Sequence, residues 1–329
     1  MTQDTNPAPT SLLTAAIATI LLTAGCAGNT SSTGNSTAST HESNFILTDE
    51  GRIHVKTQVD TLTLTLIFDS GGAGEMTLET ACARLLNAVA TEGLHRKNRI
   101  DSASIGGQNT GNTYAWCLSP NSDQDLFPGS DGIICPQYAI DRRIWEINMT
   151  NSYIRIHERD TVPPGAAIFP MRIESGRYLY TKFPVTVIRG RDTMKTDREI
   201  LIDYGSTSAL WFEHSPLHSD PAVMEFFTSS PQPQVVEKEW CEEYTLMADK
   251  IILPDGMGTL TSSTDNLKIS LTVLNEEYYH EESVLKYPAA IMGIGILRHW
   301  NVMLDLKNKR LILFPGARAT VNTAAPSFT

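Results

Sequence analysis

The amino-acid sequence predicts an all-β protein with two related barrel-like lobes, a cleft between them and a few short helices. Three observations lead to this fold class. Short β-type runs dominate from Asn44 onward, one order of motifs occurs twice, and a segment rich in Pro and Gly separates the two copies. The 329 residues suit about two domains, and with 41% hydrophobic residues the chain can bury a sizeable core.

The first copy of the repeated unit contains a strand that ends at an aspartate. Residues Thr61–Phe68 (TLTLTLIF) alternate Thr and Leu, which is typical of a half-buried strand, and they follow a shorter run at His54–Val59. The strand leads into the DSGG turn at residues 69–72. The apolar segment Asp131–Cys135 comes later, and the hairpin strands Trp145–Asn148 and Tyr153–His157 close the unit.

The second copy repeats this order. The strand Glu199–Ile202 follows another at Lys182–Arg189 and leads into the DYGS turn at residues 203–206. The apolar segment Ala290–Leu297 and the hairpin strands Asn301–Leu306 and Arg310–Phe314 follow. This is a duplication of one unit, and a site shared by duplicated units is expected at the interface between them.

The boundaries of the two lobes follow from the repeat. We expect an N-terminal lobe over residues 44–160, a joint at 161–166 (TVPPGA), a C-terminal lobe over 167–316 and a tail over 317–329. Apolar residues at helical spacing predict short helices at Thr77–Ala90 and Pro221–Thr228. The Gly-rich run Ile105–Thr113 and the Asp255-Gly256 dipeptide are typical of hairpin tips.

The N-terminal residues 1–26 are typical of an export signal. Ser11–Gly25 is an unbroken apolar and small run that is short for a membrane span, and small residues precede Cys26 as in a bacterial lipoprotein signal. Cys26 is the predicted lipidation site, which would anchor the protein to a membrane of the cell envelope, periplasmic or cell-surface. The first ten residues depart from this pattern because they contain Asp4 and no Lys or Arg; a buried helix is the alternative.

The stretch after the signal, residues 27–43, is rich in Ser, Thr, Asn and Gly, and it has no large apolar residue. Such a stretch cannot offset the entropy lost on ordering, so it predicts a flexible tether. The remaining four cysteines would then lie where disulfides can form, and buried free thiols are an equal alternative. These cysteines are Cys82, Cys117, Cys135 and Cys241.

Charge and composition exclude several classes of partner and cofactor. The formal charge is −11 and the pI is near 5.2, which argues against a nucleic-acid partner because phosphate binding needs a basic surface. The eight histidines are scattered without an H-E-x-x-H motif, and no paired C-x-x-C is present, so we expect no metal site. Nothing in the sequence requires a cofactor.

The repeated motifs resemble the aspartic protease superfamily over about residues 44–316. The turns at 69–72 and 203–206 are similar to its two catalytic turns, and the segments at 131–134 and 291–293 are similar to its apolar-apolar-glycine segments, with Gly132 and Gly293 as the packing glycines. The region Gly293–Pro315 is especially similar to bacterial retropepsin-like proteases with two lobes in one chain. The resemblance implies two aspartic-protease-like β-barrel lobes and an endopeptidase acting on protein or peptide.

The resemblance also implies roles for residues in the two turns. Asp69 and Asp203 would share one proton, and together they would activate water and protonate the substrate carbonyl. A single chain supplies both aspartates, so a monomer would suffice, and the oligomeric state stays open. A further set is expected to support the turns: Ser70, Gly71, Tyr204, Gly205 and Ser206. Gly106, Gly107 and Gly111 would belong to an active-site flap or to a plain surface hairpin.

Several positions depart from the family pattern. Tyr204 stands where the family has Thr or Ser, so the hydroxyl bridge beneath the dyad should be lost or rearranged. Gly72 stands where the family usually has Thr, Ser or Ala, and Cys135 stands where it often has glycine. Asn148 stands where the family often has Asp, and the equivalent residue of the second lobe, Asp305, keeps that acid. The sequence therefore leaves a peptide-binding protein without activity as an alternative. A serine hydrolase using Ser70 or Ser206 is less favoured, since no G-x-S-x-G elbow is present.

Overall fold

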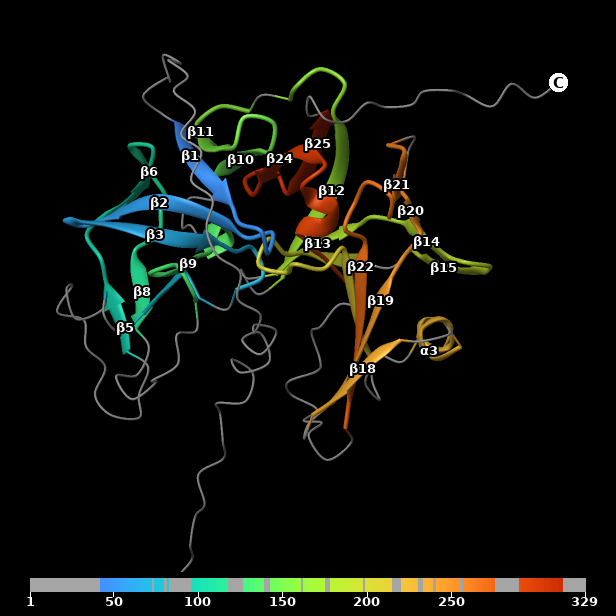
Figure 1. The fold of residues 1–329 in the computed structure, drawn as a ribbon. Coiled ribbons are helices and arrows are strands. Elements are labelled where there is room, and N and C mark those ends of the chain that lie inside the picture. The colour runs from blue at the N-terminus through green and yellow to red at the C-terminus, as the bar shows by residue number, and fades with distance from the viewer. Residues whose placement is uncertain are drawn as a thin grey trace, which may run out of the picture.

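The structure is a computed structural model, and it confirms the all-β fold class (Figure 1). It describes residues 42–72, 74–79, 82, 96–117, 127–138, 143–160, 162–174, 178–197, 199–214, 220–229, 233–238, 241–254, 257–275 and 290–315. The predicted signal, the lipidation site Cys26, most of the tether, the tail and the Asp255-Gly256 turn lie outside these residues.

A six-stranded antiparallel sheet joins the two halves of the chain at the centre of the molecule (Figure 1). Neighbouring strands pair in the order β1 (Glu42–Leu47), β11 (Tyr153–His157), β10 (Ile144–Asn148), β24 (Trp300–Asp305), β25 (Arg310–Pro315) and β12 (Ala167–Glu174). The β10–β24 pairing crosses from the first half to the second, with Glu146 opposite Met303. Both hairpins predicted from the sequence, β10–β11 and β24–β25, lie in this sheet.

Each half adds its own strands on one side of the central sheet. The first half contributes β2 (Ile53–Val59), β3 (Leu62–Phe68), β4 (Met76–Leu78), β5 (Arg96–Arg99), β6 (Ala103–Ile105), β7 (Gln108–Asn109), β8 (Tyr114–Cys117) and β9 (Gly132–Ile134). The second contributes β13 (Tyr178–Lys182), β16 (Glu199–Ile202), β17 (Leu210–His214), β18 (Gln234–Glu237), β19 (Cys241–Met247), β22 (Lys268–Leu274) and β23 (Ala290–Met292). A separate four-stranded sheet contains β14 (Val185–Arg189), β15 (Asp192–Thr196), β20 (Lys250–Ile252) and β21 (Thr259–Thr261).

The duplication seen in the sequence is also present in the strand pairing. In the first half, β3 runs parallel to β9, β9 is antiparallel to β4, and β4 is parallel to β8. In the second half, β16, β23, β17 and β22 pair in the same order and the same directions. Both units therefore place the strand that ends at an aspartate beside the apolar segment.

The two central hairpins share one turn and differ in the side chains that hold it. The Asn148 side-chain oxygen accepts the Asn151 N–H at 2.9 Å, and the Asp305 carboxylate accepts the Asn308 N–H at the same distance. In the second half, Arg310 pairs with Asp305 across its hairpin. In the first half, the Asn148 amide instead donates to the Tyr153 hydroxyl at 2.9 Å. The absence of an acid at position 148 is thus matched by the absence of a cation across the strand.

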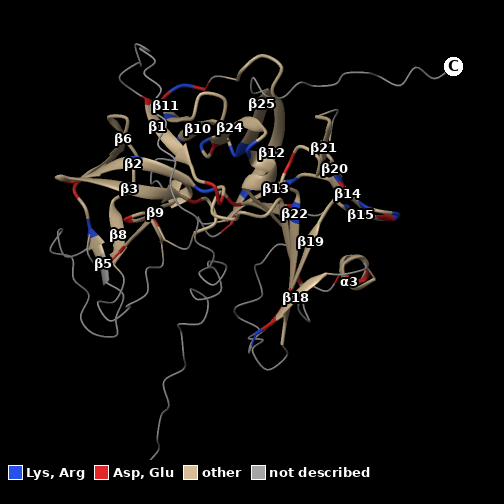
Figure 2. Cartoon of the chain, viewed as in Figure 1, with Lys and Arg blue, Asp and Glu red and all other residues tan. Residues whose placement is uncertain are grey.

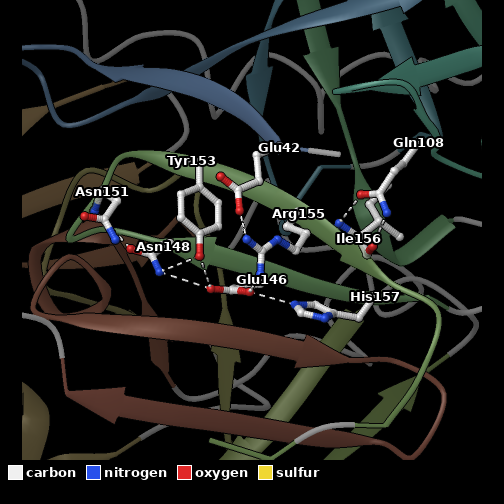
Figure 3. A network of polar contacts seen from close by, with 9 residues as sticks. All are labelled: Glu42, Gln108, Glu146, Asn148, Asn151, Tyr153, Arg155, Ile156 and His157. Carbon is white, nitrogen blue, oxygen red and sulfur yellow. Dashed lines mark hydrogen bonds and ion pairs between the residues drawn. The ribbon is translucent and has the colours of Figure 1, made fainter. Parts of the chain in front are cut away.

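A network of polar side chains ties β1 to β10 and β11 (Figure 3). Glu146 accepts hydrogen bonds from the Tyr153 hydroxyl at 2.8 Å and from Asn148 at 3.0 Å, and it contacts His157 Nε2 at 2.6 Å. Burial by itself would raise the pKa of Glu146, but these hydrogen bonds outweigh it and hold the pKa below its usual value. Arg155 contacts both Glu146 and Glu42, so the first residue of β1 is fixed to the central sheet.

Several predicted elements differ in their bounds. Strand β1 starts at Glu42, inside the predicted tether, because β11 supplies a pairing partner that the sequence does not reveal. The helix predicted at Thr77–Ala90 does not begin there, since Thr77 lies in β4; nearly all the rest is outside the described residues. The strand predicted at 182–189 is broken by Pro184, which cannot donate a ladder hydrogen bond, so β13 ends before it and β14 begins after it.

Other expectations agree with the structure. Helix α3 spans Pro221–Thr228 as predicted, with the Asp220 carboxylate accepting the N–H groups of its first turn. Residues 162–166 lie in a turn between β11 and β12. The four described cysteines are buried and free, as one of the two alternatives had it; they are Cys82, Cys117, Cys135 and Cys241. Within the described residues, no helix has the length and apolar character needed to cross a membrane.

Candidate active site

The two predicted aspartates lie at equivalent ends of equivalent strands. Asp69 follows β3 and Asp203 follows β16, and in each case the backbone N–H donates to the parallel apolar strand. The Asp69 N–H donates to Ile134 O at 3.0 Å, and the Asp203 N–H donates to Met292 O at 3.0 Å. Each apolar segment thus fixes the height at which its carboxylate emerges from the sheet.

The two turns interlock through their glycines. The Gly71 N–H donates to Asp69 Oδ1, and the Gly205 N–H donates to Asp203 Oδ1, both at 2.7 Å. A methyl group at Gly71 would lie only 2.3 Å from the Asp203 carboxyl carbon, and one at Gly205 only 2.6 Å from that of Asp69. Glycine is therefore required at both positions because each turn lies against the opposite carboxyl group, and the two carboxyl groups meet.

The environment of the pair favours a shared proton. Burial raises the pKa of Asp69, and the N–H groups of Gly71 and Gly72 together with the hydrogen bond to Asp203 partly oppose this. Burial also raises the pKa of Asp203, and the neighbouring charge of Asp69 raises it further. A buried carboxyl pair of this kind titrates as a unit that holds one proton over a range of pH.

Ser70 and Tyr204 occupy equivalent positions but do different things. The fully buried Ser70 hydroxyl donates to Ile202 O at 2.8 Å and accepts the Tyr204 N–H at 3.0 Å, so it bridges to the opposite turn. The Tyr204 ring lies in the core against Phe68, at 5.6 Å between ring centroids, and its hydroxyl has no partner. The expected loss of symmetry is observed: one half of the bridge is made and the other half is replaced by core packing. Because its hydroxyl is enclosed, Ser70 is not available as a nucleophile.

The two predicted packing glycines, Gly132 and Gly293, are not equivalent in the structure, and the counterpart of Gly293 is Cys135, which the sequence placed where a glycine is frequent. Gly293 follows β23, and its N–H donates to Ala209 O at 3.2 Å, next to the second turn. In the first half this place belongs to Cys135, whose N–H donates to Glu75 O at 3.0 Å. Gly132 begins β9 with φ +144°, and a methyl group there would lie 2.0 Å from Thr77 O, so it is needed for close packing of β9 on β4.

Apolar side chains flank the dyad on the same face of each sheet. Side chains two residues apart on a strand share a face, so Ile67 lies on the side of Asp69 and Leu201 on the side of Asp203. Ile67 packs with Ile133, and Leu201 packs with Ile291, in two clusters separate from the main core. The sequence interpretation did not single out Ile67 and Leu201 for the site, although their position in the strand alternation was a usable signal.

Arg52 is a further residue that the sequence did not point to. It lies in the turn between β1 and β2, and its positive charge acts to lower the pKa of Asp69. Its neighbour Gly51 lies against Ile294 of α5 (Ile294–Leu297), because a methyl group at Gly51 would be 3.0 Å from that side chain. No local sequence pattern predicts this approach, since it depends on the packing of the first half on the second.

The Gly-rich hairpin does not provide the flap considered from the sequence. Gly106 and Gly107 form the predicted tight turn between β6 and β7, but a methyl group at Gly106 would lie 2.7 Å from the Glu42 backbone. The Gln108 side chain bonds the backbone of Ile156 (Figure 3). The hairpin tip is therefore docked on the central sheet. Gly111 lies just beyond it, where its N–H donates to the Asn109 side chain.

Charged residues of both signs are interspersed along the described parts of both lobes (Figure 2). Among the described residues, no group of three or more His, Cys, Asp or Glu side chains is arranged to hold a metal ion.

Comparison with known proteins supports the fold at the level of architecture. The chain matches no family model and no curated protein. It is similar to the solved structure of an aspartic proteinase from Irpex lacteus, with a TM-score of 0.51 and 13% identical residues, over 85% of this chain and 98% of that one. At this identity the likeness shows the fold alone, and that fold is the all-β aspartic-proteinase architecture predicted from the sequence.

Proposed function

We propose that the protein hydrolyses peptide bonds in protein or peptide substrates by an aspartic-protease mechanism. The observation that carries this proposal is the interlocked pair of turns, in which Gly71 lies against Asp203 and Gly205 against Asp69. This arrangement places the buried carboxyl group of Asp69 and the partly buried carboxyl group of Asp203 against each other at the lobe interface. Such a pair can carry one negative charge and one proton at the same time.

The mechanism follows from the division of that proton. The charged carboxylate accepts a proton from a water molecule as the water oxygen attacks the substrate carbonyl carbon. The protonated carboxyl group donates its proton to the carbonyl oxygen, which gives a neutral tetrahedral gem-diol. Return of one proton to the amide nitrogen then allows the C–N bond to break. Because burial raises the pKa of both aspartates, activity should extend from acid toward neutral pH and fall when the pair loses its last proton.

The main rival from the sequence was an inactive peptide-binding protein, and Tyr204 was the feature that favoured it. In the structure the Tyr204 ring points into the core beside Phe68, while Ser70 still bridges the two turns. Position 204 therefore gives no support for loss of activity, and the carboxyl pair supports hydrolysis.

The test is hydrolysis of a quenched-fluorescence peptide library between pH 3 and pH 8 by the full chain, beside Asp69→Asn and Asp203→Asn. We expect kcat/KM to fall about 10²- to 10⁴-fold in each variant, as for loss of a general acid or base. Asp192→Asn is the matched control, because Asp192 is exposed on β15. Hydrolysis that persists at the parent rate in either dyad variant, or a folded parent that cleaves nothing at any pH, would refute the proposal.

We also propose export and a lipid anchor at Cys26, supported by the apolar run Ser11–Gly25, the small residues before Cys26 and the polar stretch after it. A single acyl chain gives weak anchoring, so the membrane fraction should depend on full lipidation. Labelling cells with a fatty-acid analogue tests this: label on the parent and none on Cys26→Ser is expected. Equal labelling of both would refute the assignment.

We propose in addition that the protein belongs to the bacterial retropepsin-like group of aspartic proteases, on the similarity of the region Gly293–Pro315.

A further inference from the structure

Two departures from the twofold repeat lie next to each other beside Asp69. In the second turn, Ser206 carries a side chain and the facing residue after β23, Gly293, has none. In the first turn the arrangement is reversed: Gly72 has no side chain and Cys135 has one. The backbone hydrogen bonds to Glu75 and Ala209 establish that positions 135 and 293 are equivalent.

The space confirms that this is an exchange rather than two separate changes. A methyl group at Gly72 would lie 2.5 Å from Cys135 Sγ and 3.0 Å from Asp69 Oδ2. The sulfur therefore fills the volume that a side chain at position 72 would take, and Asp69 Oδ2 borders the same volume. Gly72 does not have a positive φ, so its backbone would accept another residue. The sulfur is the nearest atom that opposes a side chain there, followed by Asp69 Oδ2 and by Ile133 Cδ1 at 3.1 Å.

The second turn shows the complementary situation. A methyl group at Gly293 would lie 2.3 Å from Ser208 O, 2.4 Å from Ser206 O and 2.9 Å from Ser206 Oγ, so backbone and side-chain atoms of the turn region exclude a side chain there. The Ile294 N–H donates to Ser206 O at 2.9 Å and holds the turn close to α5. Each half therefore has one small polar side chain in the volume between its turn and its apolar segment.

The first half makes room for the larger sulfur by changing one backbone contact. Pro136, at the start of the 3₁₀ turn Pro136–Tyr138, has no N–H and cannot make the bond that Ile294 makes. The Gln137 amide instead donates to Gly72 O at 3.2 Å. A longer side-chain link thus replaces the backbone link, and the thiol occupies the space between.

We propose that Cys135 is the positioning residue for Asp69, supplying from the apolar segment the side chain that Ser206 supplies from the turn beside Asp203. This inference rests on the proposed hydrolytic function, because its purpose is to hold one carboxylate of the dyad. The thiol stays protonated, since burial and then the charge of Asp69 raise the pKa of Cys135. The thiol is therefore an S–H group that borders the same volume at Gly72 as Asp69 Oδ2, and it is fully enclosed and not a nucleophile.

The experiment is a double-mutant cycle on the full chain with Gly72→Ser, Cys135→Gly and both together. Gly72→Ser alone overlaps the sulfur and Cys135→Gly alone leaves a void, so each should lower kcat at least about tenfold with a smaller change in KM. The pair recreates the arrangement of the second half and should recover kcat to within about threefold of the parent. Losses that simply multiply in the double variant would overturn the exchange.

A second measurement does not depend on activity. Carboxyl carbon NMR follows the titration of Asp69 in Cys135→Ala and in the control Cys241→Ala, whose thiol is buried in β19. Loss of the S–H neighbour should move the titration of the pair upward by about half a unit, and the control should not move it. An unchanged titration in a folded Cys135→Ala variant overturns the positioning role. If the parent cleaves no peptide but the titration shifts, the hydrolytic function fails while the contact stands.

Discussion

Removal of the Ser70 hydroxyl is expected to weaken the connection between the two turns more than any other single-atom change at the site. The hydroxyl is fully buried and makes two hydrogen bonds to the opposite turn, to Ile202 O and from the Tyr204 N–H. Ser70→Ala leaves both backbone groups buried without a partner. Each such group costs about 1–3 kcal/mol, so the free energy of unfolding should fall by about 2–6 kcal/mol.

The assay is urea unfolding followed by tryptophan fluorescence, with peptide hydrolysis measured at the same pH. Ser43→Ala is the matched control, because the Ser43 hydroxyl makes one long 3.4 Å bond to Lys56 O at an exposed position. That control should change stability by less than about 0.5 kcal/mol. We expect Ser70→Ala to lower hydrolysis as well, since the two aspartates are no longer held at one height. A Ser70→Ala variant as stable as the control would show that the bridge does not join the turns.

Three further predictions concern buried polar groups. Tyr204→Phe removes a buried hydroxyl that has no partner, so the free energy of unfolding should rise by about 1 kcal/mol and the melting temperature should rise with it. Tyr204→Thr leaves a cavity and should lower the free energy of unfolding by about 3–5 kcal/mol. Folding lowers the pKa of Glu146 below its unfolded value of 4.5. Ionised Glu146 therefore stabilises the folded state at pH values above 4.5, and this stabilisation is lost as the pH falls through the folded pKa. In urea titrations, Glu146→Gln should lower the free energy of unfolding by about 1–3 kcal/mol at pH 7 and by little at pH 3. Burial raises the pKa of Glu213 to about 7, so the folded state holds a proton on Glu213 that the unfolded chain releases above about pH 4.5. The free energy of unfolding of the parent should therefore fall as the pH rises from 4.5 to 7, and that of Glu213→Gln should not. Equal pH profiles of the two proteins would contradict this.

The sequence by itself determined the architecture because each feature of the repeat is specified by residues that are close together in the chain. Strand alternation at Thr61–Phe68, the Asp-x-Gly turns and the paired hairpins each depend on neighbours a few residues apart, and their order along the chain fixes two similar units. The position of the dyad follows from the same order, since equivalent turns of duplicated lobes meet at their interface. Asp69 and Asp203 themselves were predicted from the resemblance of their turns to the catalytic turns of the aspartic protease superfamily, and the structure brings them together.

Only the tertiary structure decided which side chains exchange roles across the repeat. Gly72 and Cys135 look like two unrelated departures in the sequence, and their contact becomes visible only when the apolar segment lies across the turn. The docking of the Gly106-Gly107 tip on β1 has the same origin, because a glycine turn specifies its own shape but not its target. The Tyr204 ring lies in the core, edge-on to Phe68 of the other lobe. These outcomes depend on packing between segments far apart in the chain, which local propensity and periodicity do not encode.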